Sequence, residues 1–216
     1  ASIYSDLYRS EWVQYLIDKP CDYIDMGTNL NYKISRDAQV ELRYGYKSVY
    51  KNKKNLYFNE IEYIHQHKLK LHLAWQPIDK IKLKTEVIYR INIPDSLQKV
   101  QKTDLRKGFL ISQDLQYSIE KPDLQIHCRI ALFESDTYNE RIYAYENDLQ
   151  YCFTVNNYYD KGVRYYLIIR YKLGIMTIQG RISRTVYQNK QTVGSGNDQI
   201  NQNHKTEVKI QTIFNF

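Results

Sequence analysis

After Pro20, polar and apolar residues alternate with a period of two through one segment of the chain after another. In residues 68–76, for example, leucines and Trp75 alternate mainly with lysine and histidine. Successive side chains of a β-strand point to opposite faces, so each segment predicts a strand with one apolar and one polar face. We recognise ten such segments, at 22–34, 39–47, 68–76, 81–91, 109–119, 124–132, 148–155, 163–172, 176–186 and 207–216.

Two parts of the chain depart from this alternation. Aromatic residues recur at helical spacing behind Ser5 or Asp6, which predicts a short helix over 5–17, with a strand as the alternative. Alternation also breaks over 134–162, which leaves the number of strands open by one or two. We therefore expect an amino-terminal segment, 1–20, followed by a single β-domain, 21–216.

Strand length and connection length both point to a membrane. Segments of about ten residues exceed the five or six that are usual in soluble sheets, and they match the roughly 9–11 that a tilted strand needs to cross a bilayer. Short turns on one side and long loops on the other are typical of outer-membrane barrels. The predicted turns are 35–37, 77–79, 120–123 and 173–174, and the predicted loops are 51–60, 94–106, 134–146 and 188–204.

Aromatic residues stand near the ends of the apolar faces, where an outer-membrane barrel places its aromatic girdles. The chain has 22 tyrosines, and its last segment, KTEVKIQTIFNF, ends on an aromatic residue as closing strands of such barrels do. We expect this segment to pair with 176–187 and, in a closed barrel, with the first strand. The residues predicted at the lipid boundary are Tyr44, Tyr46, Tyr117, Tyr171, Phe214 and Phe216.

The alternation does not say which face is exposed, so two interpretations remain. With the apolar face outward, the chain is an antiparallel, up-and-down transmembrane β-barrel of about ten strands, or the carboxy-terminal part of a larger one. With the apolar face inward, it is a soluble β-barrel or sandwich that binds an apolar ligand or nucleic acid. Strand length, connections and aromatic placement favour the first, with the lipid bilayer as partner and the outer membrane as location.

Net charge is +7, and most basic residues of the segments fall on the polar face. In a barrel they would face the lumen, where they pair with carboxylates or favour anions. Nucleic-acid binding is the rival interpretation, and ten similar segments make it the weaker one. The lumen-facing basic candidates are Lys68, Lys70, Lys82, Lys84, Arg90, Arg164, Arg170 and Arg181, and the expected partners include Glu41, Glu86, Asp114, Glu146 and Asp148.

No catalytic, cofactor or metal signature stands out. The chain has no GxSxG motif, and its three cysteines form no CxxC pair. His65 and His67 would share one face of a strand, but polar or loop-edge histidines are the simpler interpretation. We therefore predict a non-enzymatic protein, structural or pore-like, without cofactor or metal.

Several stretches resemble the carboxy-terminal barrel of helix-hairpin-helix-containing outer-membrane proteins of Gram-negative bacteria. This resemblance implies a barrel recognised by the barrel-assembly machinery through its last strand. Nothing in the chain matches the helix-hairpin-helix modules themselves, so their DNA-binding role is not carried over. The stretches are EWVQYLIDKP (11–20), NYKISRDAQVELRYGYK (31–47), RIYAYENDLQYCFTV (141–155), YYDKGVRYYLIIRYKL (158–173) and TVGSGNDQINQNHKTEVKIQ (192–211).

Overall fold

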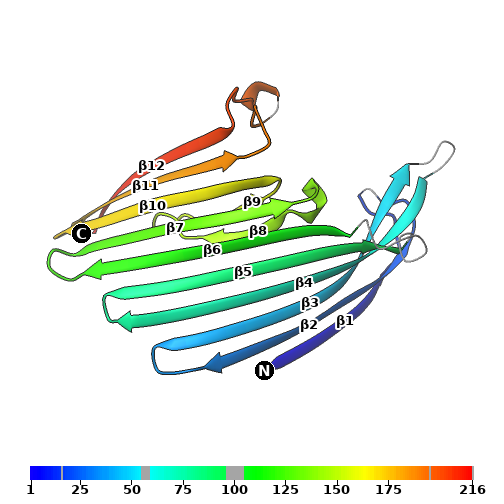
Figure 1. Cartoon of the computed structure of the whole chain (residues 1–216), viewed down its shortest axis with the longest axis horizontal. Coiled ribbons are helices and arrows are strands. Elements are labelled where there is room, and N and C mark those ends of the chain that lie inside the picture. Colours follow the sequence, from blue (N-terminus) through cyan, green and yellow to red (C-terminus); the bar gives the residue numbers. More distant parts are fainter. Residues whose placement is uncertain (16, 55–58, 96–104, 195, 216) are drawn as a thin grey trace.

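Ten antiparallel strands form one continuous sheet in the computed structural model, which describes residues 1–216 except 16, 55–58, 96–104, 195 and 216 (Figure 1). The strands are β1 (Ser2–Ser10), β2 (Cys21–Lys33), β3 (Ala38–Lys54), β4 (Asn59–Ile78), β5 (Ile81–Pro94), β6 (Arg106–Ile119), β7 (Leu124–Ser135), β10 (Lys161–Leu173), β11 (Met176–Tyr187) and β12 (His204–Phe214). Each strand pairs with its neighbours in this order, so the predicted all-β, antiparallel, up-and-down arrangement is confirmed.

A separate hairpin stands between β7 and β10 in the sequence. It consists of β8 (Ile142–Glu146) and β9 (Thr154–Tyr158), preceded by the short 3₁₀ helix η3 (Tyr138–Glu140). A second 3₁₀ helix, η4 (Gly196–Asp198), lies in the connection between β11 and β12. No helix among the described residues is long and apolar enough to cross a membrane.

The predicted number of strands in the sheet is right, but two assignments behind it were wrong. The helix predicted over 5–17 does not form in the described residues, because Ser2–Ser10 pairs with Cys21–Asn29 along its whole length. An isolated short helix is marginal in water, whereas a paired strand satisfies its backbone groups. Residues 148–155 do not form a strand of the sheet, since only Thr154 and Val155 are extended and they belong to β9.

Short and long connections lie at opposite ends of the sheet (Figure 1). The short ones, at 34–37, 79–80, 120–123 and 174–175, define what we call the turn end. They agree with the predicted turns, apart from a small shift at β4, which continues to Ile78 past an irregularity after Trp75. The other end, here the loop end, carries the longer connections, including 188–203.

The two faces of the sheet have the opposite polarity from those of a soluble sheet. The inner face, on which β8 and β9 lie, buries charged and polar side chains such as Asp114, Arg129 and Arg181. The outer face exposes aliphatic side chains: Val208 is 64% and Ile210 78% exposed. Other exposed outer-face residues are Leu69, Leu71, Leu73, Trp75, Ile130, Leu132, Leu167, Ile169, Ile178 and Ile182.

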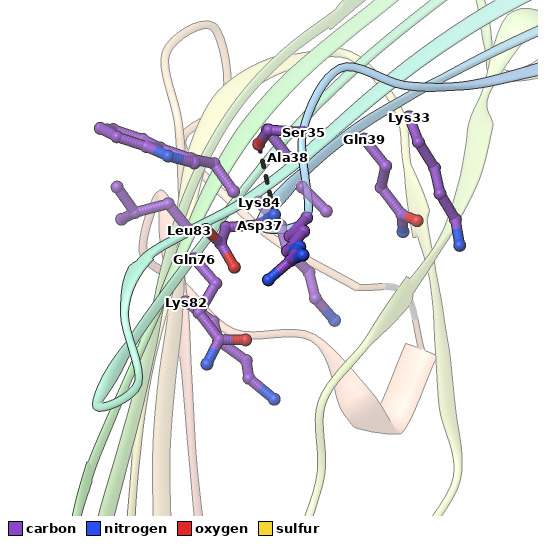
Figure 2. A pocket seen from close by; sticks show the side chains of 12 residues that line it. Lys33, Ser35, Asp37, Ala38, Gln39, Gln76, Lys82, Leu83 and Lys84 are labelled. Atoms are coloured by element: carbon purple, nitrogen blue, oxygen red, sulfur yellow. Dashed lines mark hydrogen bonds between the residues drawn. The ribbon is translucent and has the colours of Figure 1, made fainter.

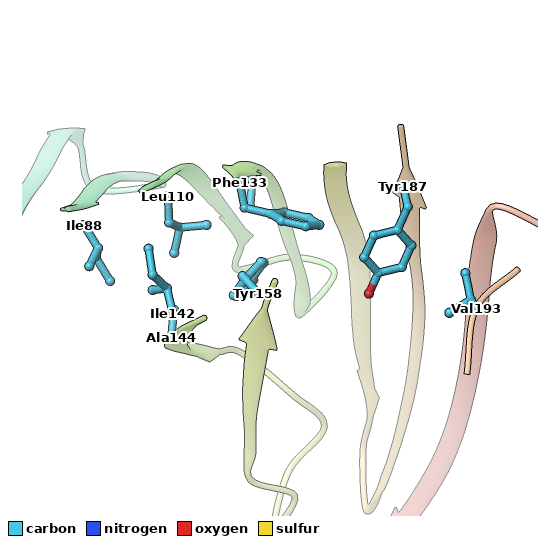
Figure 3. Packing of buried hydrophobic residues seen from close by; sticks show 9 residues of the cluster. Ile88, Leu110, Phe133, Ile142, Ala144, Tyr158, Tyr187 and Val193 are labelled. Atoms are coloured by element: carbon cyan, nitrogen blue, oxygen red, sulfur yellow. The ribbon is translucent and has the colours of Figure 1, made fainter. Parts of the chain in front are cut away.

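Near the loop end, the inner face also carries an apolar core. Ile88, Leu110 and Phe133 project from β5, β6 and β7 onto Ile142, Ala144 and Tyr158 of the hairpin (Figure 3). Tyr187 and Val193 extend this cluster toward β11 and the connection that follows it. The hairpin is therefore held at this end by apolar packing.

β1 and β12 are the two edges of the sheet. β12 pairs with β11 from Met176↔Phe214 to Val186↔His204, as the sequence predicted. The predicted pairing of β12 with the first strand is not formed, and the sheet is not closed into a barrel.

Gly108 of β6 shows how closely the 3₁₀ helix η3 approaches the sheet. A Cβ on Gly108 would lie 2.3 Å from the carbonyl oxygen of Glu140, whereas a Cβ on Gly180 of β11 would meet nothing within 4 Å. We expect Gly108→Ala to destabilise the protein by about 1–3 kcal/mol, the usual cost of overpacking. Gly180→Ala is the matched control and should be neutral. Thermal melting of the two variants checks this, and equal melting temperatures would contradict the close contact.

Candidate functional site: the charged network on the inner face

The inner segment, residues 137–158, crosses the inner face of β5–β7 and β10–β12. This segment is not a strand of the ten-stranded sheet, so its residues need not alternate between an apolar outer face and a polar inner face. Its sequence accordingly lacks a sustained alternation. Instead, it presents carboxylates, amides and backbone carbonyls to arginine and lysine side chains of the strands. These contacts fix the segment along its length, beyond the apolar core at the loop end.

Glu146, the last residue of β8, is the centre of the network. It is fully buried, and its carboxylate accepts hydrogen bonds from Arg164 Nε at 2.7 Å and Arg164 Nη2 at 3.1 Å. Arg181 Nη2 donates to the same carboxylate at 2.5 Å, and so does the hydroxyl of Tyr158 at 2.5 Å. Two arginines from adjacent strands, β10 and β11, thus hold one carboxylate of the inner segment.

A second buried ion pair lies beside it. Arg129 of β7 donates from Nε and Nη2 to the two oxygens of Asp114 at 2.7 and 2.6 Å, a bidentate geometry. Arg129 Nη1 also donates to the carbonyl of Tyr145 at 2.6 Å. Tyr166 donates to Asp114 at 3.2 Å and accepts from the backbone N–H of Asn147 at 3.2 Å. This pair therefore connects β6, β7 and β10 to the inner segment.

The segment is also anchored beyond β8. Asp148 accepts from Lys209 Nζ of β12 at 2.6 Å and lies 3.4 Å from Arg181 Nη1. The side-chain oxygen of Gln150 accepts from Arg170 Nη2 at 3.1 Å, and its backbone N–H donates to Gln179 at 3.0 Å. These contacts reach β10, β11 and β12 in the direction of the turn end.

The start of the segment is fixed at the loop end. Glu140, which is 1% exposed, accepts from Asn92 Nδ2 of β5 at 2.8 Å and from the hydroxyl of Thr137. Arg90 Nη1 donates to the carbonyl of Arg141 at 3.0 Å. The inner segment is therefore bound to six strands of the sheet, β5–β7 and β10–β12.

The arginines keep the buried carboxylates ionised. Burial alone would raise the pKa of Glu146, but the hydrogen bonds and charge of Arg164, with Tyr158 and Arg181, hold this pKa below its ordinary value. Burial acts the same way on Asp148, and Lys209 lowers its pKa most strongly. Four carboxylates (Asp114, Glu146, Asp148 and Glu207) form ion pairs with five cations (Arg129, Arg164, Arg181, Lys205 and Lys209), which leaves one positive charge in excess.

The structure places all eight predicted basic residues on the inner face and brings four of them to the inner segment: Arg90, Arg164, Arg170 and Arg181. Lys70 pairs with Glu86 at 3.2 Å, away from the segment, and Lys68 is half-buried on β4. Sequence reasoning left Arg129 out of the candidate set, although its polar parity on 124–132 was the available signal. It had no signal for Tyr158 or Tyr166, because their partners are distant in sequence.

Lys82 and Lys84 lie apart from the network, in a pocket of about 310 Å³ at the turn end (Figure 2). Lys33 and Arg36 line the same pocket, together with Asp37 and Gln76. Among the residues that the structure describes, no carboxylate forms an ion pair with any of these four cations. The turn end of the inner face is thus basic, whereas the middle is nearly neutral.

Most of the described aromatic candidates fall near the turn end of the outer face. Tyr44 and Tyr46 instead lie in the middle of β3, where their hydroxyls meet Nδ1 of His67 and His65, each at 2.8 Å. Each of the five strands that run toward the turn end has an outer-face aromatic among its last four residues. These are Tyr32, Trp75, Tyr117, Tyr171 and Phe214; the remaining candidate, Phe216, lies outside the described residues.

Metal-binding residues are not gathered anywhere in the described part of the chain. His65 and His67 share the outer face and bind tyrosine hydroxyls, and no group of three or more His, Cys, Asp or Glu residues stands at metal-binding distance there. The candidate site is therefore the charged network itself.

No protein-family model, curated protein or solved structure matches the chain. The resemblance to helix-hairpin-helix-containing outer-membrane proteins accordingly stays a prediction.

The lowered pKa values of Glu146 and Asp148 predict an acid-sensitive inner segment. Their contribution to stability is complete above the unfolded values of 4.5 and 3.8, and it is lost as the pH falls through the lower folded values. We expect hydrogen exchange in β8 and β9 to accelerate below about pH 4, before exchange in the sheet does. Acceleration that begins above pH 4.5 would contradict this assignment.

Glu146→Gln provides the matched variant for the same measurement. It keeps the shape of the side chain but removes the buried negative charge that Arg164 and Arg181 share, and breaking a buried ion pair in this way typically costs about 3–5 kcal/mol. We expect β8 and β9 to exchange rapidly in this variant already at pH 7, with a weaker dependence on acid than in the parent protein.

Proposed function

We propose that this chain is an outer-membrane β-barrel protein, structural or pore-like, whose outer face meets lipid and whose inner segment narrows a polar lumen. The single observation that carries the proposal is the polarity of the two faces. Side chains such as Leu71, Ile182 and Ile210 are exposed, while Glu146 and Arg181 are buried.

Water is a poor solvent for this outer face. Burying a leucine, isoleucine or valine side chain stabilises a protein by about 1.5–3 kcal/mol, so a soluble fold would turn these residues inward. Contact with lipid would remove the free-energy cost of exposing these apolar side chains to water on all of the strands. Strands of 9 to 20 residues, such as β1 and β4, are also long enough for the roughly 9–11 residues that a tilted crossing needs.

Two further features support a bilayer. Aromatic side chains stand near the turn end of the outer face, and Phe109 and Tyr165 stand among the first five residues of β6 and β10 at the loop end. They correspond to the two water–lipid boundaries, where aromatic residues are favoured. Short connections gather at one end and long ones at the other, as in outer-membrane barrels. The resemblance to the barrel of helix-hairpin-helix-containing outer-membrane proteins points the same way.

A membrane barrel also needs closed edges, because unpaired backbone groups are costly in hydrocarbon. In the proposal, β12 and β1 pair with each other or with further strands of a larger barrel. The last strand, with Phe214 near its end, is the segment that the barrel-assembly machinery would recognise.

The inner face suggests how such a lumen would behave. The inner segment occupies the space beside β5–β7 and β10–β12, so it acts as a constriction. Lys33, Arg36, Lys82 and Lys84 line the turn-end mouth without an ion-pair partner among the described residues, so anions are favoured there.

An arginine scan of the outer face tests the membrane proposal. Leu71 is 41% exposed in the middle of β4, and Leu173 is 46% exposed at the turn end of β10. At the bilayer midplane an arginine costs about 2–4 kcal/mol, and near the interface about 0–1. We therefore expect Leu71→Arg to impair refolding into phosphatidylcholine vesicles strongly and Leu173→Arg to impair it little.

Heat-modifiable gel mobility of the vesicle-bound protein is the measurement. A soluble fold would tolerate both arginines equally, since substitutions at exposed positions usually change stability by less than about 0.5 kcal/mol. Equal behaviour of the two variants, or a parent protein that stays entirely in the aqueous fraction, would overturn the proposal.

Ion selectivity tests the pore-like part. We expect channels of the refolded protein in a planar bilayer to prefer chloride over potassium, and the double variant Lys82→Gln/Lys84→Gln to reduce this preference. The reversal potential in a salt gradient measures it. Lys47→Gln serves as the control, because Lys47 lies outside the turn-end pocket and pairs with Asp25. An unchanged reversal potential in the double variant would contradict the anion-selective mouth.

A further inference from the structure

Arg184 is a cation on the mainly apolar outer face. It stands in β11, three residues from the loop end of the strand, and it pairs in register with Tyr165 of β10 and Thr206 of β12. Its Nε atom is buried and has no hydrogen-bond partner, and no described residue forms an ion pair with the guanidinium. By contrast Lys161, at the first residue of β10, pairs with Glu134 at 3.1 Å.

A groove of about 600 Å³ leads away from Arg184 across the outer face. It is bordered by two neighbouring rows of side chains that follow the pairing register from β6 toward β12. One row consists of Gln113, Ile130, Tyr165, Arg184 and Thr206, and the other of Leu115, Cys128, Leu167 and Ile182. Neighbouring strands lie about 4.8 Å apart, so a groove across five strands is roughly 19 Å long.

An apolar groove with a cation near one end matches an anionic lipid, which has apolar acyl chains and a negatively charged headgroup. The floor and walls are aliphatic and aromatic, and the cation stands toward the end of one row, beside the hydroxyl of Thr206. A buried guanidinium nitrogen without a partner is costly, and a phosphate oxygen would satisfy both its hydrogen bond and its charge. Long basic side chains at a lipid boundary characteristically reach the headgroup layer.

We propose that this groove binds one anionic phospholipid, with an acyl chain along Leu115, Cys128 and Leu167 and the phosphate at Arg184. The inference rests on the proposed membrane function, since it needs the outer face in lipid. The site would hold that lipid at the loop end of the barrel.

The direct probe is native mass spectrometry of the refolded protein in detergent with dilauroyl phosphatidic acid. Dilauroylglycerol, which has the same chains without the phosphate, is the ligand control. We expect phosphatidic acid to bind at least about tenfold more tightly than the diacylglycerol, and Arg184→Leu to abolish this difference. Lys161→Leu also removes an outer-face cation near the loop end but lies outside the groove, so it should leave the preference unchanged.

Refolding into pure phosphatidylcholine vesicles distinguishes failure of the proposed membrane function from failure of the proposed lipid site. Arg184→Leu should insert there at least as well as the parent protein, because it removes a charge from the lipid face. A parent protein that fails to insert would refute the membrane function. A protein that inserts but binds both ligands equally, or an Arg184→Leu variant that keeps the preference, would refute the lipid site alone.

Discussion

The fully buried carboxylate of Glu146 is the contact on which the inner face depends. It is bound by Arg164, Arg181 and Tyr158, and the two arginines come from adjacent strands of the sheet. Each arginine is buried and would be strongly destabilising without a counter-charge. The carboxylate of Glu146 therefore balances the charge of the two arginines and, at the same time, fixes the inner segment to β10 and β11.

From this contact the network spreads by shared partners. Arg181 also lies near Asp148, which binds Lys209, while Asp114 and Arg129 connect the neighbouring strands to the carbonyl of Tyr145. Networks of this kind are favourable when every member is satisfied and costly when one is missing. The charged groups of the inner face thus form a cooperative unit. The apolar side chains of the outer face do not depend on one another in this way, and many of them are exposed.

The sheet therefore has a buried, charged inner face and an exposed, apolar outer face. A soluble sheet gains stability by removing its apolar side chains from water, and this sheet has placed its charged side chains inside instead. The polarity is the observation that supports the membrane proposal over the soluble interpretation. It also makes Arg184 conspicuous, since a cation on the apolar outer face needs a partner that the described chain does not supply.

Local periodicity determined much of the fold. The alternation of 163–172 and 176–186 sets which residues share a face, and it placed Arg164, Arg170 and Arg181 on the polar one. Turn residues such as those at 35–37 and 120–123 marked the ends of strands within a few residues. These properties depend on neighbours close in sequence, so the sequence alone contains them.

Only the tertiary structure decided the rest. Glu146 binds Arg164 and Arg181, which are 18 and 35 residues away in the sequence. Asp148 binds Lys209, which is 61 residues away. No local sequence pattern extends over such separations. The same holds at the start of the chain, where helical spacing over 5–17 predicted a helix but Ser2–Ser10 pairs with β2 as a strand. Alternation alone does not say whether the apolar or the polar face of the strands is buried. The structure buries the polar face, with Glu146 between Arg164 and Arg181.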